Sequence, residues 1–253
     1  MSLKMKAGSN LGQASASVAG MAKQIRFASA VALTRTARQI KAAEELEMRD
    51  VFERPTPYTM SAVYMRPATK ADLTAEVGLK NFASKAVPAA KYLLPQIVGG
   101  SRRPKRFERA LQAVGALPAG YRAVPGSAAQ VDVFGNISRG QIVQILSFFK
   151  AFPEMGYKAN MSDKRRAQLA RGSRQRQGFT YFVGTPGGRL PLGIWQRIPF
   201  ARGSAVKPVM IFVPSTTYEA IFDFGYVARM VVDRELDAQF RRAFDEAMAS
   251  VRP

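Results

Sequence analysis

The sequence predicts an α+β protein in which antiparallel hairpins pack with helices and a long helix lies near each end of the chain. Two long stretches, one near each terminus, carry apolar residues at helical spacing and contain no internal proline. Between them, β-prone runs come in pairs around Gly- and Pro-rich turns and do not alternate regularly with helices. The chain has 253 residues, 47% of them hydrophobic, which is enough for a sizeable core in one large domain or two small ones.

The first long helix is predicted within residues 18–57, behind a polar stretch of small residues at 1–17 that we expect to be a flexible arm. Pro55 and Pro57 end the helical pattern. At ~1.5 Å per residue the helix would be roughly 50 Å long, which a core of this size covers poorly, so we expect it to contact another chain. The apolar positions expected at this subunit interface are Met21, Ile25, Ala28, Leu33, Ala37 and Ile40.

The remaining residues, 58–253, are predicted to form an α+β body. Its expected elements are a hairpin over 58–79, short helices within 87–100 and 104–118, a helix over 138–149, a strand pair over 178–200, a strand over 206–214 and a C-terminal helix over 223–251. One side of that last helix carries Leu236, Phe240, Phe244, Ala247 and Val251.

The stretch "VDVFGNISRGQIVQIL", residues 131–146, is the best candidate for a phosphate-binding turn, since a helix N-terminus attracts anions. It has neither the G-x-x-x-x-G-K-[ST] nor the G-x-G-x-x-G spacing of the known phosphate loops. We therefore interpret it as a turn at Gly135 and Asn136 followed by Ser138 as the helix N-cap. The apolar residues expected to face the core are Ile142, Val143, Ile145 and Leu146.

The composition excludes most catalytic chemistry. The chain has no cysteine and no histidine, which removes disulfides, thiolate and imidazole metal ligands and every Ser-His-Asp arrangement. No apolar run approaches the ~18 residues of a membrane span, and no secretory signal is evident, so we expect a cytoplasmic product.

Catalysis by carboxylate, lysine or serine side chains is not excluded, but the sequence offers only weak candidates for such a site. Ser147 and Lys150 match S-x-x-K without its companion motifs. Asp72, Glu76 and Lys80 could form a metal-dependent nuclease centre, but we expect them on the solvated face of a strand. The acids Glu44, Glu45, Glu47 and Asp50 are expected on the wet side of the long helix. We predict no enzymatic activity and no cofactor.

The charge of the chain favours anionic partners. Its 38 Lys and Arg against 18 Asp and Glu give a net charge of +20. A basic segment at 158–177 concentrates this charge, contains Asp163 as its only acid, and is interrupted by Gly172 and Ser173. It would contact phosphate backbones without sequence preference, or an acidic protein neighbour. Its cations are Lys158, Lys164, Arg165, Arg166, Arg171, Arg174 and Arg176.

Five blocks of sequence, in this order, carry a resemblance to a known family. They are "RPTPYTMSAVYMRPATKADLTAEVGLK", "GALPAGYRAVPG", "VDVFGNISRGQIVQIL", "GGRLPLGIWQR", and "VKPVMIFVP" followed by "YEAIFDF". Over residues from about 30 to 250 the chain resembles the minor tail protein Z family of tailed bacteriophages and their prophages.

The resemblance implies a virion structural protein at the head-proximal end of the tail, involved in tail completion and in joining the tail to the head. It implies no catalytic residues. We accordingly expect a homo-oligomeric ring in the virion, with other phage tail or neck proteins as partners. Non-specific contact with DNA is a further partner interaction that the sequence leaves open. The alternative is a basic DNA-binding accessory protein without sequence specificity, and a metal-dependent nuclease comes third.

Overall fold

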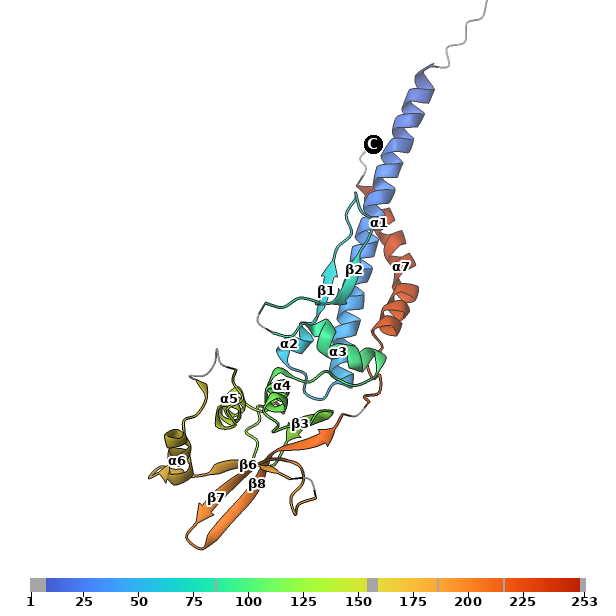
Figure 1. Cartoon of the computed structure of the whole chain (residues 1–253). Helices are drawn as coiled ribbons and strands as arrows, with labels where there is room; N and C mark the ends of the chain where they lie inside the picture. The colour runs from blue at the N-terminus through green and yellow to red at the C-terminus, as the bar shows by residue number, and fades with distance from the viewer. Residues whose placement is uncertain (1–7, 85, 154–158, 186, 216, 251–253) are drawn as a thin grey trace, which may run out of the picture. The chain divides into compact units, whose positions relative to one another are not determined.

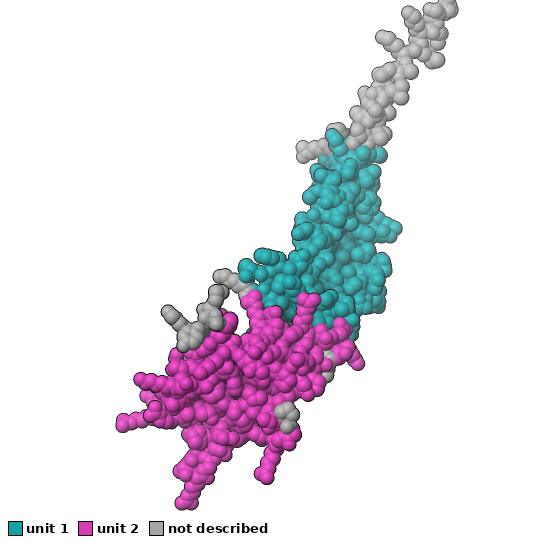
Figure 2. Space-filling view, in the orientation of Figure 1, with its two compact units in different colours: residues 1–98, 220–253 teal, residues 99–219 magenta. Residues whose placement is uncertain are grey.

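The computed structural model describes residues 8–84, 86–153, 159–185, 187–215 and 217–250 (Figure 1). The chain divides into two compact units (Figure 2). Unit 1 combines the chain up to Val98 with the chain from Ala220 onward, and unit 2 is Gly99–Glu219. Helices and antiparallel strands occur in both units, which confirms the predicted α+β class, including the long helices near the two ends.

Helix α1 is Gly8–Val51, 44 residues. It begins earlier than the predicted Val18, so residues 8–17 of the expected flexible arm are helical and that part of the prediction is wrong; residues 1–7 lie outside the described chain. Among these early residues Ala and Gln favour a helix, whereas Ser and Gly lower the helix propensity without blocking a helix as proline does. The helix ends where expected, because Arg54 adopts a φ of 49° and Pro55 follows.

Helix α7, Phe224–Ala249, runs antiparallel along α1 (Figure 1). Asp223 caps it by accepting a hydrogen bond from the Tyr226 amide at 3.0 Å. A cluster of buried alanines lies between the two helices, namely Ala28, Ala32, Ala243 and Ala247. Such small side chains let helix backbones approach closely. The expectation that the core of this chain leaves α1 largely uncovered is therefore wrong, since its C-terminal helix covers much of α1.

The face predicted for the C-terminal helix is only partly buried. Ala247 is buried and Phe244 packs beside it, but Phe240 is 37% exposed. Leu236 is half-buried. Val251 lies outside the described residues.

The rest of unit 1 is a short helix, a hairpin and a second helix: α2 (Pro57–Met60), β1 (Val63–Arg66), β2 (Glu76–Leu79) and α3 (Ala89–Val98). The strands pair antiparallel with Val63 opposite Leu79. The predicted hairpin began at Tyr58, but Thr56 accepts a hydrogen bond from the Thr59 amide and starts α2 there instead. The hydrophobic core of this part contains Met48, Ala62, Val63, Ala89, Leu93 and Phe222.

Unit 2 is built on a four-stranded antiparallel sheet with the order β3-β8-β7-β6. The strands are β3 (Tyr121–Pro125), β6 (Thr180–Gly184), β7 (Gly193–Phe200) and β8 (Gly203–Pro214). The predicted strand pair over 178–200 is confirmed as β6 and β7, and β8 begins at Gly203, before the predicted Val206. The chain turns so tightly from β7 to β8 that Phe200 pairs with Gly203.

Helices α4 (Arg106–Ala113) and α5 (Arg139–Phe148) supply the other part of the core of unit 2. Leu111 of α4 and Ile145 of α5 are buried in one cluster with Ile194, Val209 and Met210 of the sheet. The remaining elements of this unit are α6 (Asp163–Arg171) and a two-stranded hairpin, β4 (Gly172–Ser173) with β5 (Arg176–Gln177).

Candidate interaction surfaces

The basic segment is an ordered helix and hairpin over its described residues. Ser162 caps α6, since its hydroxyl accepts a hydrogen bond from the Arg165 amide at 3.3 Å. Gly172 ends the helix with a φ of 73°, a left-handed conformation that favours glycine, and this confirms the predicted interruption. Lys158, the first cation of the predicted set, lies outside the described residues.

Arg166 belongs to the fold more than to the surface. Its guanidinium lies over the ring of Phe148, 4.9 Å from the centroid, and donates a hydrogen bond to the carbonyl of the same residue. Asp163 forms a second contact at 3.8 Å. These interactions hold α6 against the end of α5, so Arg166 is a poor candidate for contact with a partner.

The other cations of the segment are exposed and, among the described residues, lack an ion-pair partner. The single acid of the segment, Asp163, contacts Lys150 and Arg166 instead. Lys164 and Arg171 line a hollow of about 410 Å³. The five available cations are Lys164, Arg165, Arg171, Arg174 and Arg176.

The two aromatic residues that follow the segment in sequence form no platform for base stacking. Tyr181 follows the segment in sequence but is only 5% exposed, and its hydroxyl donates a hydrogen bond to Gln144 at 2.9 Å. Phe182 is half-buried beneath the guanidinium of Arg197, 4.8 Å from the ring centroid. Neither of these two rings is free to stack a nucleotide base beside the cations.

The predicted interface positions of α1 separate into two groups. Ala28, Ala37 and Ile40 are buried within this chain, so their assignment to a subunit interface is wrong, and Leu33 is half-buried. Met21 and Ile25 are 49% and 44% exposed. Because Ala28 shares a cluster with the last turns of α7, and α7 ends at Ala249, the part of α1 before Ala28 continues past its partner helix (Figure 1).

The turn at 131–138 is structural. Ser138 caps α5 by accepting a hydrogen bond from the Gln141 amide at 3.3 Å, as predicted. The Asp132 carboxylate accepts hydrogen bonds from the amides of Asn136 and Phe134, both at 2.9 Å, and these bonds hold its pKa below its usual range. The Asp132 carboxylate therefore takes two turn amides, and Ser138 takes an amide of the helix start, that an anion would otherwise use. Ile145 and Leu146 are buried as expected, but Val143 is 43% exposed, which corrects its assignment to the core.

The catalytic candidates do not converge. The Ser147 hydroxyl donates to the carbonyl of Ala159 at 2.6 Å, while the Lys150 ammonium lies 3.6 Å from Asp163. Lys150 therefore does not form the direct hydrogen bond to Ser147 that would activate the serine hydroxyl.

The proposed strand face of Asp72, Glu76 and Lys80 is also incorrect. Asp72 lies in the loop before β2, where its amide donates to the Thr69 hydroxyl at 2.9 Å. Glu76 begins β2 and pairs with Arg66 at 3.2 Å. No acidic cluster among the described residues has the arrangement of a metal site.

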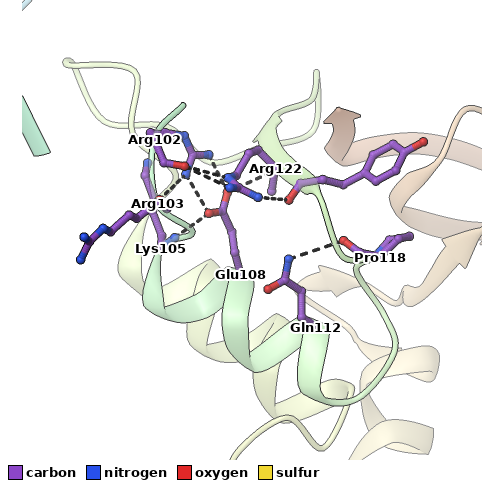
Figure 3. A network of polar contacts seen from close by, with 9 residues as sticks. Arg102, Arg103, Lys105, Glu108, Gln112, Pro118 and Arg122 are labelled. Atoms are coloured by element: carbon purple, nitrogen blue, oxygen red, sulfur yellow. Dashed lines mark hydrogen bonds and ion pairs between the residues drawn. The ribbon is translucent and has the colours of Figure 1, made fainter. Parts of the chain in front are cut away.

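A buried ion-pair network in unit 2 was missed by sequence reasoning. Glu108 is fully buried, and Arg102 donates two hydrogen bonds to its carboxylate, at 2.6 and 2.8 Å (Figure 3). The amides of Lys105 and Ala123 donate to the same carboxylate at 2.6 and 2.9 Å. Arg122 donates to the Arg102 carbonyl, so the network joins the chain before α4 to strand β3. Glu108 is the third residue of α4, where glutamate often reaches back to the helix start, and that position was the available signal.

Burial alone would raise the pKa of Glu108, but the hydrogen bonds from Arg102, Ala123 and Lys105 outweigh it and hold the pKa below its usual range. The pKa of Arg102 is raised, chiefly by its hydrogen bond with Glu108. Both groups are therefore charged in the folded protein, and the network is a structural ion pair rather than a reactive site.

Glu44 corrects the expectation that the acids of α1 face water. It is fully buried, and among the described residues neither carboxylate oxygen has a hydrogen-bond partner. Burial, with smaller contributions from the charges of Glu47 and Asp223, raises its pKa to about 8. Ile40, Glu44 and Met48 are spaced by four residues and share one buried stripe, a periodicity that could have revealed this position.

The fold and these surfaces define an α+β protein of two compact units with a basic segment and a partly uncovered long helix. No family model, curated protein or solved structure matches the chain. Within the described ranges, no helix combines the length and the apolar content that crossing a membrane requires.

Proposed function

We propose that this chain is a structural subunit of a tailed-phage virion, acting at the head-proximal end of the tail in tail completion and in the junction with the head. In this function it packs as an oligomeric ring with other tail or neck proteins. The observation that carries the proposal is the part of α1 that continues past α7, with Met21 and Ile25 exposed on it. A helix that is partnered over only part of its length is typical of a subunit whose remaining contacts come from neighbours.

Two further features support this function over an enzymatic one. The serine, lysine and acidic candidates do not converge on a reacting centre among the described residues. The ordered blocks at 54–80, 115–126, 131–146, 187–197 and 206–224 resemble a tail-protein family.

The decisive experiment uses particles and one pair of matched variants. Mass spectrometry of purified virions should find the chain in the tail or head–tail junction. Ile25→Asp should lower the yield of complete particles, because it places a charge on the surface that meets a neighbour. Met230→Asp is the control, since Met230 is a similarly exposed apolar residue, at 52%, on α7. Virions without the chain, or equal yields from both variants, would contradict the proposal.

The second candidate function is a DNA-binding accessory protein without sequence specificity. The five exposed cations of the basic segment favour it, because they are free of acidic partners among the described residues and can contact phosphate backbones. The two functions are compatible if the ring surrounds DNA. The slope of DNA affinity against salt concentration tests whether the basic segment contacts DNA.

A further inference from the structure

A groove in unit 1 lies between α1 and the loop that joins β1 to β2. Its volume is about 430 Å³. The loop is held to the helix by a hydrogen bond from the Ala68 amide to the Thr34 hydroxyl at 3.2 Å. Inside the loop, the Thr69 amide donates to the carbonyl of Asp72 at 2.7 Å. The groove therefore has two built walls, one helical and one a hydrogen-bonded turn.

The charge of the groove has one sign. Arg35 and Arg38 line it from α1, Lys70 lines it from the loop, and no acidic residue is among its lining residues. Neither Arg38 nor Lys70 has an ion-pair partner among the described residues, and both are exposed. The Lys70 ammonium lies over the ring of Phe27, 4.8 Å from the centroid, at one side of the groove.

Arg35 supplies a donor that the chain leaves unused. Its Nη2 donates to Glu246 at 2.7 Å, but its buried Nη1 has no acceptor among the described residues. A planar guanidinium binds carboxylates with two parallel hydrogen bonds, so a guanidinium with one unused nitrogen can donate to a further carboxylate oxygen. Because this nitrogen is buried, a carboxylate would reach it only if the Arg35 side chain shifted within the groove that it lines.

The uncharged part of the lining is apolar. Ala30, Val31 and Pro67 contribute carbon surface between the cations, and Phe27 adds an aromatic ring. A phosphodiester backbone makes little use of apolar surface in a groove of this kind. A peptide uses both features, because its carboxylates meet the cations while an apolar side chain covers the alanine and valine.

We propose that this groove is a docking site for an acidic peptide segment of a partner protein, one that carries carboxylates beside an apolar side chain. This docking site goes beyond the proposed function and does not depend on it, since the purified chain can bind the peptide without a particle. It is also separate from the basic segment, which lies in unit 2.

The test uses the full chain and a labelled synthetic peptide of alternating Glu and Leu, measured by fluorescence anisotropy at low salt. A peptide of alternating Gln and Leu is the uncharged control for the ligand. We expect the acidic peptide to bind and the uncharged peptide not to bind. Amide hydrogen exchange should slow at residues 68–70 and at 30–38 when the acidic peptide is added.

The double variant Arg38→Glu, Lys70→Glu should weaken the acidic peptide roughly tenfold or more, because two attractive contacts become repulsive. Lys91→Glu with Arg241→Glu is the matched control: both residues are exposed cations of unit 1 outside the groove, and the change in net charge is the same. Circular dichroism of both double variants should match that of the parent chain, since all four positions are on the surface.

Four results would overturn the proposal. They are no binding of the acidic peptide to the parent chain, equal weakening in the two double variants, exchange protection confined to residues outside the groove, and displacement of the peptide from the groove by duplex DNA more effectively than by unlabelled peptide. The last result would make the groove a phosphate site. Self-association of the chain that blocks the peptide would instead assign the groove to a second copy.

Discussion

Arg102 holds the buried carboxylate of Glu108 with two parallel hydrogen bonds, at 2.6 and 2.8 Å. Two backbone amides complete the shell around the same carboxylate. A buried charge is tolerated only when its partners are in place, so loss of the carboxylate charge would leave Arg102 uncompensated inside unit 2. This pair connects the start of α4 with β3 and should be important for the stability of that unit.

Glu108→Gln should destabilise unit 2 by about 3 kcal/mol, because it removes the negative partner of a largely buried arginine. The single tryptophan, Trp195, is in β7, so its fluorescence during denaturation reports this unit. Asp163→Asn is the control, since Asp163 pairs with Lys150 and Arg166 while remaining 85% exposed, and should change stability by less than about 1 kcal/mol. Equal effects from both variants would show that the buried network is not a special contributor.

Glu44 should make unit 1 less stable as pH rises. Its pKa is about 8 in the folded chain against an ordinary value of 4.5, so the folded state holds an extra proton between these values. The free energy of unfolding should fall over that interval by up to about 1.4 kcal/mol per pH unit and remain low above it. Helical circular dichroism during denaturation monitors α1 and α7, which dominate unit 1.

Glu44→Gln should remove this decline, because the amide keeps the shape of the side chain and does not ionise. Asp50→Asn on the same helix is the control, as Asp50 is exposed and its replacement should leave the slope unchanged. The shift of Glu108 has the opposite sign: its lowered pKa means that unit 2 should lose stability as pH falls through the acid range. A parent chain whose helical signal is equally stable from pH 5 to about 8 would contradict the prediction.

Two isoleucines of α1 should respond differently to the same charge. Ile40 is 8% exposed and Ile25 is 44% exposed. Ile40→Asp should destabilise unit 1 by roughly 3 kcal/mol because it buries an unpaired carboxylate, whereas Ile25→Asp should stay within about 0.5 kcal/mol. Thermal denaturation of the isolated chain checks both values. If Ile25→Asp unfolded the chain, its effect on particles could not be assigned to a neighbour.

The basic segment should bind duplex DNA with a steep loss of affinity as salt increases. Counterion release makes the logarithm of the binding constant fall linearly with the logarithm of salt concentration. Replacing Arg165, Arg171 and Arg174 with Gln should flatten the slope by about one unit for each phosphate contact removed. Arg166 is left intact because it packs on Phe148.

The control for this measurement replaces Lys91, Arg229 and Arg241 with Gln, three exposed cations of unit 1. It lowers the net charge equally but should leave the slope nearly unchanged. If the chain does not bind DNA at low salt, the partner of the basic segment is an acidic protein instead. Equal slopes in the two triple variants would mean that DNA responds to total charge and not to this segment.

Much of the local structure could be predicted from the sequence. The caps at Ser138 and Asp223, the helix stop at Gly172, the strand pair of β6 and β7 and the end of α1 before Pro55 all depend on residues within a few positions of one another. The sequence also shows directly that no cysteine or histidine chemistry can occur in this chain. Such features are settled by backbone geometry and short-range hydrogen bonds, which sequence patterns express directly.

The candidate surfaces depended on contacts between distant parts of the chain. Ala28 and Ile40 have the spacing of an interface, but α7 packs on Ala28 and Ile40 is buried within this chain. The sequence places Arg166 among the charged surface residues, but its guanidinium packs on the ring of Phe148. Glu44 belongs to an acidic stretch that is typical of a solvated helix face, but its side chain lies in the core. Short-range patterns in the sequence therefore predict most of the helices, the β6–β7 pair and the excess of positive charge. Which charges are buried, paired or free follows from the tertiary structure, because burial depends on what packs against a residue and not on its neighbours in the chain.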